Sequence, residues 1–275
     1  MTAKPCLKWA GGKSTSVPVI LRNMPKKIRT YYEPCFGGGA VFFALASEGR
    51  FERAVVSDTN QELIDTYRAI KVDVEGVIQA IRRLGPTEVT EAKYLKVRAS
   101  KPKRLASIAA SMLFLNKTGF NGLYRVNQSG EFNVPWGKRS WEPDYENLRA
   151  VARALRDVLI LCRPFDLGGL PEHGDVVYYD PPYLPVAKTS FISYSSDGFG
   201  LQQHLSLGRE FAHLAAKGVT VLASNSHCRE SLAIYRSIPD TVIRKIGVRR
   251  NINRDGDGRA KVKEILAVHR GVELS

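Results

Sequence analysis

The tetrapeptide Asp180-Pro181-Pro182-Tyr183 places a carboxylate and an aromatic ring directly after an apolar run, Asp175-Val176-Val177-Tyr178-Tyr179. The run predicts a buried strand, and because two prolines cannot continue a central strand, the chain must turn outward at the carboxyl edge of the sheet. A planar exocyclic amine is a poor nucleophile, but hydrogen bonds to a carboxylate and to a proline carbonyl favour a pyramidal nitrogen. Tyr183 would stack on the base while the nitrogen attacks a methyl sulfonium in line. An ordinary Pro-Pro turn is the alternative.

A second motif, Phe36-Gly37-Gly38-Gly39, lies between a predicted strand and a predicted helix. Its glycines would let the backbone approach a ligand closely, and the helix N-terminus offers free N–H groups. Asp58 lies 21 positions after Gly37, where an acid can accept hydrogen bonds from ribose hydroxyls. The motif indicates a nucleotide-type cofactor, with a tight turn and a helix-capping neighbour as the alternative. NAD is disfavoured because the position three after Gly39 is the bulky Phe42.

The elements that position these motifs alternate between strand and helix. Strands are predicted over residues 29–34, 53–57, 175–179 and 219–223, and helices over residues 40–46 and 205–216. Thr59-x-x-Glu62 fits a capping box that starts another helix. The segments 242–248 and 262–268 flank a loop rich in Gly, Asp and Arg, which predicts an antiparallel hairpin. The fold class is therefore α/β, with a mostly parallel sheet that ends in an antiparallel hairpin.

Residues 66–158 interrupt this alternation with basic helix-like segments and an aromatic, glycine-containing stretch. We therefore divide the chain into a catalytic domain, residues 1–65 and 159–275, and an insert, residues 66–158. Residues 105–115 predict the insert's buried helix, and Asn121-Gly122 and Ser129-Gly130 predict turns around a short hairpin.

The formal net charge is +14, and its distribution is uneven. Residues 66–158 hold 17 basic and 9 acidic side chains, residues 236–263 hold 9 and 3, and the remainder holds 15 of each. A concentrated positive charge indicates a polyanionic partner such as nucleic acid. The alternative is a cationic protein with no such partner, since its excess of basic over acidic residues would be the same.

Other features of the sequence exclude several classes of protein. No run of about 18 apolar residues occurs and the N-terminus lacks a signal-peptide core, so we expect a soluble, cytoplasmic protein without membrane contact. The four cysteines are widely spaced and include no C-x-x-C pair, which argues against disulfides and a zinc site. We therefore expect no bound metal.

Five blocks of the sequence resemble the Dam-type DNA adenine-N6 methyltransferases, in that family's order and over most of the chain. The blocks are Lys8-Trp9-Ala10-Gly11-Gly12-Lys13, Glu33-Pro34-Cys35-Phe36-Gly37-Gly38-Gly39, Ser57-Asp58, residues 121–125 with 130–137, and Asp180-Pro181-Pro182-Tyr183. The resemblance implies a Rossmann-like S-adenosylmethionine-dependent methyltransferase sheet with a mainly helical target-recognition insert between the cofactor half and the catalytic half.

The resemblance also implies a set of site residues. S-adenosylmethionine would be the methyl donor, Lys13 would meet its carboxylate, and Trp9 would cover an apolar part of it. On spacing alone, Trp9 is a core residue and Lys13 a solvated charge. The implied cofactor-binding residues are Trp9, Lys13, Glu33, Phe36, Gly37, Gly39, Asp58 and Asp180; the implied catalytic residues are Asp180, Pro181, Pro182 and Tyr183.

Double-stranded DNA is the implied partner, with the target adenine extruded from the helix. Arg125 resembles the family's guanine-reading arginine, and surface charge is the alternative for Arg125 and Lys138. The implied DNA-binding residues are Lys8, Asn121, Leu123, Arg125, Asn127, Pro135 and Lys138, while Lys101, Lys103 and Arg104 would meet phosphates or nothing.

Two positions depart from the family pattern. Cys35 stands where the family often has Phe, and we do not interpret it as a nucleophile because an exocyclic amine needs no covalent intermediate. Lys138 stands where members that recognise GATC carry Arg, and Lys offers a single charge rather than a bidentate fork. A GATC site or a related short site is therefore expected.

We expect a monomeric, site-specific DNA adenine methyltransferase that uses S-adenosylmethionine. A cytosine-N4 or RNA exocyclic-amine methyltransferase is one alternative, and a non-catalytic DNA-binding regulator is another. Asp180 and Tyr183 argue against the regulator, since a binding protein needs no amine-polarising carboxylate. A role in restriction-modification or in replication and repair signalling stays open.

Overall fold

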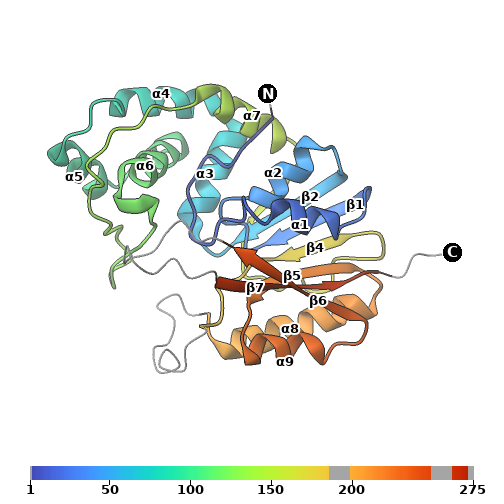
Figure 1. Ribbon diagram of the computed structural model, residues 1–275. Helices are drawn as coiled ribbons and strands as arrows, with labels where there is room; N and C mark the ends of the chain where they lie inside the picture. The colour runs from blue at the N-terminus through green and yellow to red at the C-terminus, as the bar shows by residue number, and fades with distance from the viewer. Residues whose placement is uncertain (1, 186–198, 249–261, 272–275) are drawn as a thin grey trace. The chain divides into compact units, whose positions relative to one another are not determined.

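The computed structural model describes residues 2–185, 199–248 and 262–271 (Figure 1). The chain divides into two compact units, each described by itself below. The first unit comprises Met1–Gly12, Gly37–Glu48 and Asp58–Cys162, and the second comprises Lys13–Phe36, Gly49–Ser57 and Arg163–Ser275. Within the described ranges, no helix is both long and apolar enough to cross a membrane.

The second unit is built on a mixed sheet. Its strands are β1 (Ile28–Pro34), β2 (Phe51–Asp58), β4 (Val176–Tyr179), β5 (Thr220–Ser226), β6 (Thr241–Val248) and β7 (Val262–His269). They lie in the order β2-β1-β4-β5-β7-β6; β1 is parallel to β2 and β4, β4 is parallel to β5, and β7 is antiparallel to β5 and β6. This arrangement confirms the α/β fold and the antiparallel hairpin. The charged segment between β6 and β7, residues 249–261, lies outside the described residues.

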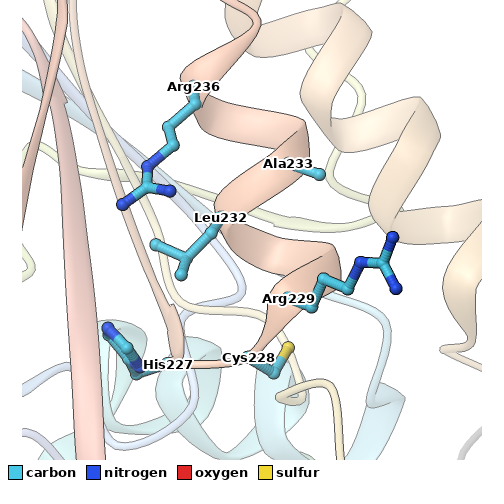
Figure 2. Close-up of a pocket in the computed structure, with 6 residues that line it drawn as sticks. All are labelled: His227, Cys228, Arg229, Leu232, Ala233 and Arg236. Atoms are coloured by element: carbon cyan, nitrogen blue, oxygen red, sulfur yellow. The ribbon is translucent and has the colours of Figure 1, made fainter.

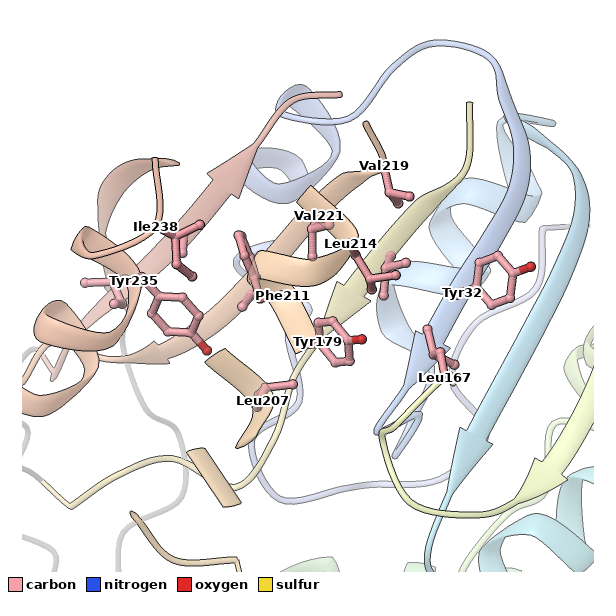
Figure 3. Packing of buried hydrophobic residues seen from close by; sticks show 14 residues of the cluster. Tyr32, Leu167, Tyr179, Leu207, Phe211, Leu214, Val219, Val221, Tyr235 and Ile238 are labelled. Atoms are coloured by element: carbon pink, nitrogen blue, oxygen red, sulfur yellow. The ribbon is translucent and has the colours of Figure 1, made fainter. Parts of the chain in front are cut away.

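The core of the second unit forms between the sheet and its helices. These helices are α1 (Val17–Arg22), which precedes β1, and α8 (Leu201–Ala216) and α9 (Arg229–Arg236), which follow β4 and β5. Leu207, Phe211 and Leu214 recur at helical spacing and form one apolar stripe of α8. Figure 3 shows this stripe packed with Tyr179 and Val221 of the sheet. The residue before Asp180 is therefore fixed in the core.

The first unit is mainly helical. It contains α2 (Ala40–Ser47), α3 (Gln61–Val72), α4 (Val74–Leu84), α5 (Glu91–Ala99), α6 (Leu105–Thr118), the short 3₁₀ turn η1 (Phe120–Gly122), α7 (Tyr145–Ala154) and β3 (Leu159–Cys162). α6 packs against α3 and α4, and its Leu113 and Phe114 are fully buried, which confirms the predicted buried helix. The interpretation of residues 66–158 as a target-recognition insert stays a prediction.

The glycine-containing stretch of the first unit forms the predicted short hairpin. Val126 bridges Phe132 in antiparallel fashion, and Gly130 adopts a φ of 75° in the turn between them. The side chain of Asn127 closes this turn, because its Oδ1 accepts hydrogen bonds from the N–H groups of Ser129 and Glu131. The turn prediction at Ser129-Gly130 is confirmed.

The predicted start of α3 is wrong by one residue. We expected Thr59 to cap the helix, but Asn60 is the cap, and its Oδ1 accepts a hydrogen bond from Leu63 N at 2.9 Å. The reason is Asp58, whose Oδ1 accepts from Asn60 N at 3.0 Å and closes a turn over Thr59. The helix therefore begins after that turn.

Candidate active site

Residues 180–183, which the sequence analysis predicts to be catalytic and which we call the catalytic loop for that reason, leave the sheet at the carboxyl end of β4. Because β1 and β5 flank β4 and run parallel to it, the carboxyl ends of the three strands share one edge of the sheet. Tyr178 and Tyr179 are fully buried, and Tyr178 shares a 2.8 Å hydrogen bond with Ser224 Oγ of β5. Asp180 therefore directly follows two buried strand residues, the first of which is hydrogen-bonded to β5.

Lys13 lies against the catalytic loop. Its Nζ is 2.8 Å from Asp180 Oδ1 and 4.7 Å from the centroid of the Tyr183 ring. Its backbone is fixed as well, because the Lys13 carbonyl accepts hydrogen bonds from Ser16 N and Val17 N at the start of α1. Only 6% of the Lys13 side chain is exposed, so the alternative of a solvated charge is wrong.

The protonation of Asp180 depends on two opposing effects. Burial raises the pKa of its carboxyl group, and the nearby Lys13 ammonium lowers it. The Glu264 carboxylate adds a smaller upward effect on the same pKa. The net effect raises the pKa of Asp180 above its ordinary value, and the Lys13 charge limits that rise in favour of the ionised form, which can accept hydrogen bonds from an amine.

Tyr183 is held at its hydroxyl end. The hydroxyl donates a 3.1 Å hydrogen bond to Glu264 Oε2 of β7. Burial raises the pKa of Tyr183 well above its ordinary value, so the phenol stays neutral and remains a donor. The sequence analysis did not identify Glu264, because an acid within an apolar run has no distinctive spacing.

The polar end of β5 contacts the residue that follows the catalytic loop. Asn225 Oδ1 accepts a 3.2 Å hydrogen bond from Leu184 N, and Ser226 Oγ donates a 2.5 Å hydrogen bond to Leu184 O. The sequence analysis ended this strand at residue 223 and missed both side chains. The available signal was the polar run Ser224-Asn225-Ser226 directly after the apolar residues 219–223, where the strand reaches the carboxyl edge of the sheet.

The glycine motif of the first unit forms a turn around Asp58. Gly37 N donates a 3.0 Å hydrogen bond to Asp58 Oδ2, and the Tyr67 hydroxyl donates to Gly37 O at 3.3 Å. A Cβ at Gly37, whose φ is 49°, would lie 2.7 Å from Cδ1 of Trp9, so the indole packs directly on the turn. Burial raises the pKa of Asp58, and the N–H donors of Asn60 and Gly37 lower it. The acid predicted 21 positions away thus closes the turn.

Three positions that the sequence analysis singled out, Glu33, Cys35 and Phe36, lie at the end of β1 in the second unit. Glu33 is 2% exposed and accepts a 2.8 Å hydrogen bond from the Tyr31 hydroxyl, and Phe36 is likewise buried. Cys35 adopts a φ of 96°, a conformation that costs a residue with a Cβ. Cys35 N and Phe36 N both donate to Ser57 O at 2.9 Å, which holds this strained turn.

Arg125 of the first unit is exposed and held beside the short hairpin. Its Nε donates to Asn133 Oδ1 at 2.7 Å, and its Nη2 donates to Asn133 O at 3.2 Å. Tyr124 stacks on Trp9 with 5.4 Å between ring centroids, and its hydroxyl donates to Glu62 Oε2 at 2.9 Å. The predicted base-reading segment is therefore attached to the residue that packs on the glycine turn.

Lys8 approaches the same segment. Asn116 connects them, since its Oδ1 accepts from Lys8 N and its Nδ2 donates to Lys8 O and Gly122 O. Burial, and to a smaller extent the charge of Arg139, lower the pKa of Lys8. The other predicted DNA contacts in this unit are Asn121 at a φ of 53°, Leu123 after η1, Asn127 in the hairpin turn, the exposed Pro135 and Lys138 at a φ of 54°.

A pocket follows the carboxyl end of β5 in the second unit. Figure 2 shows the six residues that line it, which are His227, Cys228, Arg229, Leu232, Ala233 and Arg236. No lining side chain is acidic, so the pocket is electrostatically suited to an anionic group. Among the residues that the structure describes, no cluster of three or more His, Cys, Asp or Glu side chains is placed to hold a metal ion.

Comparison with known proteins gives consistent matches. The model of the D12 class N6 adenine-specific DNA methyltransferase family matches residues 9–252. The Type II methyltransferase M.MjaIII of Methanocaldococcus jannaschii is 36% identical, with 94% of this chain and 96% of the relative covered. The Type II methyltransferase M1.LlaDCHI of Lactococcus lactis subsp. cremoris is 34% identical, with 98% and 96% covered. The DNA adenine methylase of Escherichia coli (strain K12) is 34% identical, with 96% and 94% covered.

Proposed function

The chain belongs to the D12 class N6 adenine-specific DNA methyltransferases, and we propose that residues 180–183 form its catalytic loop and S-adenosylmethionine is its methyl donor. The enzyme methylates adenine in DNA, and the mixed sheet is its Rossmann-like methyltransferase fold. The observation that carries the assignment is the partly buried Asp180 carboxylate, paired with the buried Lys13 at the carboxyl end of β4 and followed by two prolines and Tyr183.

The catalytic loop acts on the target amine. An adenine extruded from the duplex stacks on Tyr183, at an unstacking cost of a few kcal/mol. Its N6 hydrogens donate to the Asp180 carboxylate and to a proline carbonyl, which directs the nitrogen lone pair out of the base plane. In-line attack would form the nitrogen–carbon bond as the carbon–sulfur bond breaks, which would leave the sulfur as a neutral thioether, and N6 would then release one proton to solvent.

The chemistry of the proposed donor-binding residues fits S-adenosylmethionine. When bound, this donor would supply a methyl group attached to a positively charged sulfur. Asp58 offers a carboxylate to ribose hydroxyls beside the N–H groups of the turn at Gly37 and Gly39. Trp9 offers an aromatic surface, and Lys13 offers a cation that can bind the donor's carboxylate while it holds Asp180. The remaining residues of the predicted set are buried: Glu33 lies within β1, and Phe36 follows the end of that strand.

DNA reading is assigned to the first unit. Arg125 presents a guanidinium whose position is fixed by Asn133, and Arg can bind guanine O6 and N7 as a fork. Lys138 supplies a single charge in place of a second arginine, which favours a site related to GATC but less strictly read. Lys8, Asn121, Leu123, Asn127 and Pro135 are the neighbouring contacts.

The test is substitution of the catalytic carboxylate with DNA binding as the second readout. We expect Asp180→Ala to abolish methyl transfer and to leave most of the DNA affinity, because a carboxylate contributes no phosphate contact. Since this variant leaves Lys13 buried without its counter-charge, Asp180→Ala/Lys13→Met serves as the matched variant that restores local neutrality. Methyl transfer near the parent rate in either variant would overturn the assignment.

A further inference from the structure

His204 lies in the first turn of α8 and is 1% exposed. Its Nδ1 faces Asn225 Nδ2 at 3.2 Å, and the ring meets Phe199 edge to face at 4.8 Å. Its Nε2 is buried and makes no hydrogen bond of regular geometry to any residue in the described part of the chain. His204 is therefore a buried ring whose Nδ1 contacts Asn225 and whose Nε2 has no regular hydrogen bond. Buried polar atoms of this kind usually have a partner or a role.

The neighbours of Asn225 fix the direction of its amide. Asn225 Oδ1 accepts hydrogen bonds from two backbone N–H groups, Leu184 N at 3.2 Å and Ser226 N at 2.8 Å. The oxygen must occupy that position because N–H groups only donate, so the Asn225 NH₂ faces His204. His204 Nδ1 is then the acceptor and carries no proton.

The charge of His204 follows from its burial. Desolvation lowers its pKa to about 4, and the Pro182 carbonyl raises that pKa to a smaller extent. The ring is therefore neutral at physiological pH, and its one proton resides on Nε2. The Pro182 carbonyl of the catalytic loop is near enough to raise the pKa of the ring, although Nε2 makes no hydrogen bond of regular geometry to it.

We infer that His204 is a positioning residue: hydrogen bonds join Leu184 N–H, Asn225 and the His204 ring, and the Nε2 proton of that ring is directed at the Pro182 carbonyl. Pro182 and Leu184 flank Tyr183, so these contacts hold the loop on both sides of the residue that stacks on the target base. Glu264 holds the Tyr183 hydroxyl independently. The inference rests on the proposed role of the catalytic loop, and His204 itself does not touch the substrate.

The alternative is a buried histidine that only fills space, and the two roles differ in kinetics. His204→Phe keeps an aromatic ring against Phe199 and removes both ring nitrogens. We expect its kcat to fall about 10²-fold, the effect of a displaced catalytic group, while KM for S-adenosylmethionine and DNA affinity stay within about twofold of the parent values. His213→Gln, an exposed position on the same helix, is the matched control and should keep the parent kcat.

The tautomer provides a readout that packing alone does not move. Nitrogen NMR of ¹⁵N-histidine-labelled protein should show His204 with the proton on Nε2, assigned by the signal lost in His204→Phe. Asn225→Asp keeps the acceptor for Leu184 N and replaces the donor that faces Nδ1 with a carboxylate, so His204 should gain a proton on Nδ1.

The outcomes separate the two levels of the proposal. A parent protein that transfers methyl groups, together with His204→Phe at unchanged kcat or a parent tautomer protonated on Nδ1, would overturn the positioning role alone. A parent protein without methyl transfer would overturn the proposed function, and the parent and Asn225→Asp spectra would still decide the direction of the hydrogen bond between Asn225 and His204. If His204→Phe does not fold, sequential NMR assignment identifies the His204 signal instead, and the parent and Asn225→Asp spectra decide the inference.

Discussion

Replacement of Lys13 by Met should change the pH dependence of methyl transfer. Lys13 Nζ is 2.8 Å from Asp180 Oδ1 in a setting where 6% and 19% of the two side chains are exposed. At this distance and an effective dielectric constant of about 20, the attraction amounts to about 6 kcal/mol, and loss of one partner of a buried ion pair costs about 3–5 kcal/mol net. A protein can avoid that cost by protonating the remaining carboxylate.

The sign of the effect follows from the role of Asp180. Its ionised form accepts the amine hydrogens, so activity is present above its pKa and is lost as the pH falls through it. Burial raises the pKa of Asp180 and Lys13 lowers it, so Lys13→Met raises the pKa further and moves the acid limb of the rate profile to higher pH. At pH 7 we expect a rate loss of about 10²–10³-fold, with partial recovery at higher pH.

The assay is single-turnover methyl transfer over a range of pH at saturating S-adenosylmethionine and DNA. Lys13→Arg keeps the charge and is the control, so its acid limb should stay close to the parent's. Calorimetry would measure the affinity for S-adenosylmethionine. A role of Lys13 in donor binding alone would lower this affinity without moving the acid limb of the rate profile. An unchanged acid limb in Lys13→Met would refute the reasoning.

Three further predictions concern the glycine turn, base reading and DNA affinity. Gly37→Ala should destabilise the fold by about 1–3 kcal/mol and weaken donor binding, because its Cβ would lie 2.7 Å from Trp9 Cδ1 at a φ of 49°; Gly49→Ala, at a φ of 61° with nothing within 4 Å, should show the strain alone in thermal unfolding. Arg125→Lys should cost about 1–3 kcal/mol of discrimination at one guanine, measured as the ratio of rates on cognate and substituted duplexes; an unchanged ratio would remove Arg125 from base reading. DNA affinity should fall steeply between about 50 and 200 mM salt in titrations, and a flat response would contradict phosphate-dominated binding.

The fold followed from local patterns in the sequence. Apolar runs predicted β4 and β5, because burial on both faces leaves a continuous apolar signal, and the two segments around the charged loop predicted the β6–β7 hairpin. The start of α3 escaped prediction because Thr59 and Asn60 are adjacent residues of types that both cap helices, and only the turn that Asp58 closes with Asn60 N decides between them.

The site was predictable in its motifs but not in its contacts. Asp180 and Gly37 are conspicuous because prolines and glycines restrict the backbone in known ways. The pairing of Lys13 with Asp180 and the hydrogen bonds of Asn225 and His204 join segments far apart in the chain, and their distances depend on how β4, β5 and α8 pack. A buried polar residue such as His204 looks in sequence like any other helical position.

The most direct test of the central claim is identification of the methylated base. Duplex DNA and RNA of matched sequence would be incubated with the protein and deuterated-methyl S-adenosylmethionine, digested to nucleosides and resolved by mass spectrometry. The account predicts labelled N6-methyladenine from duplex DNA with the parent protein and none with Asp180→Ala. Label in N4-methylcytosine, or in RNA alone, would contradict it.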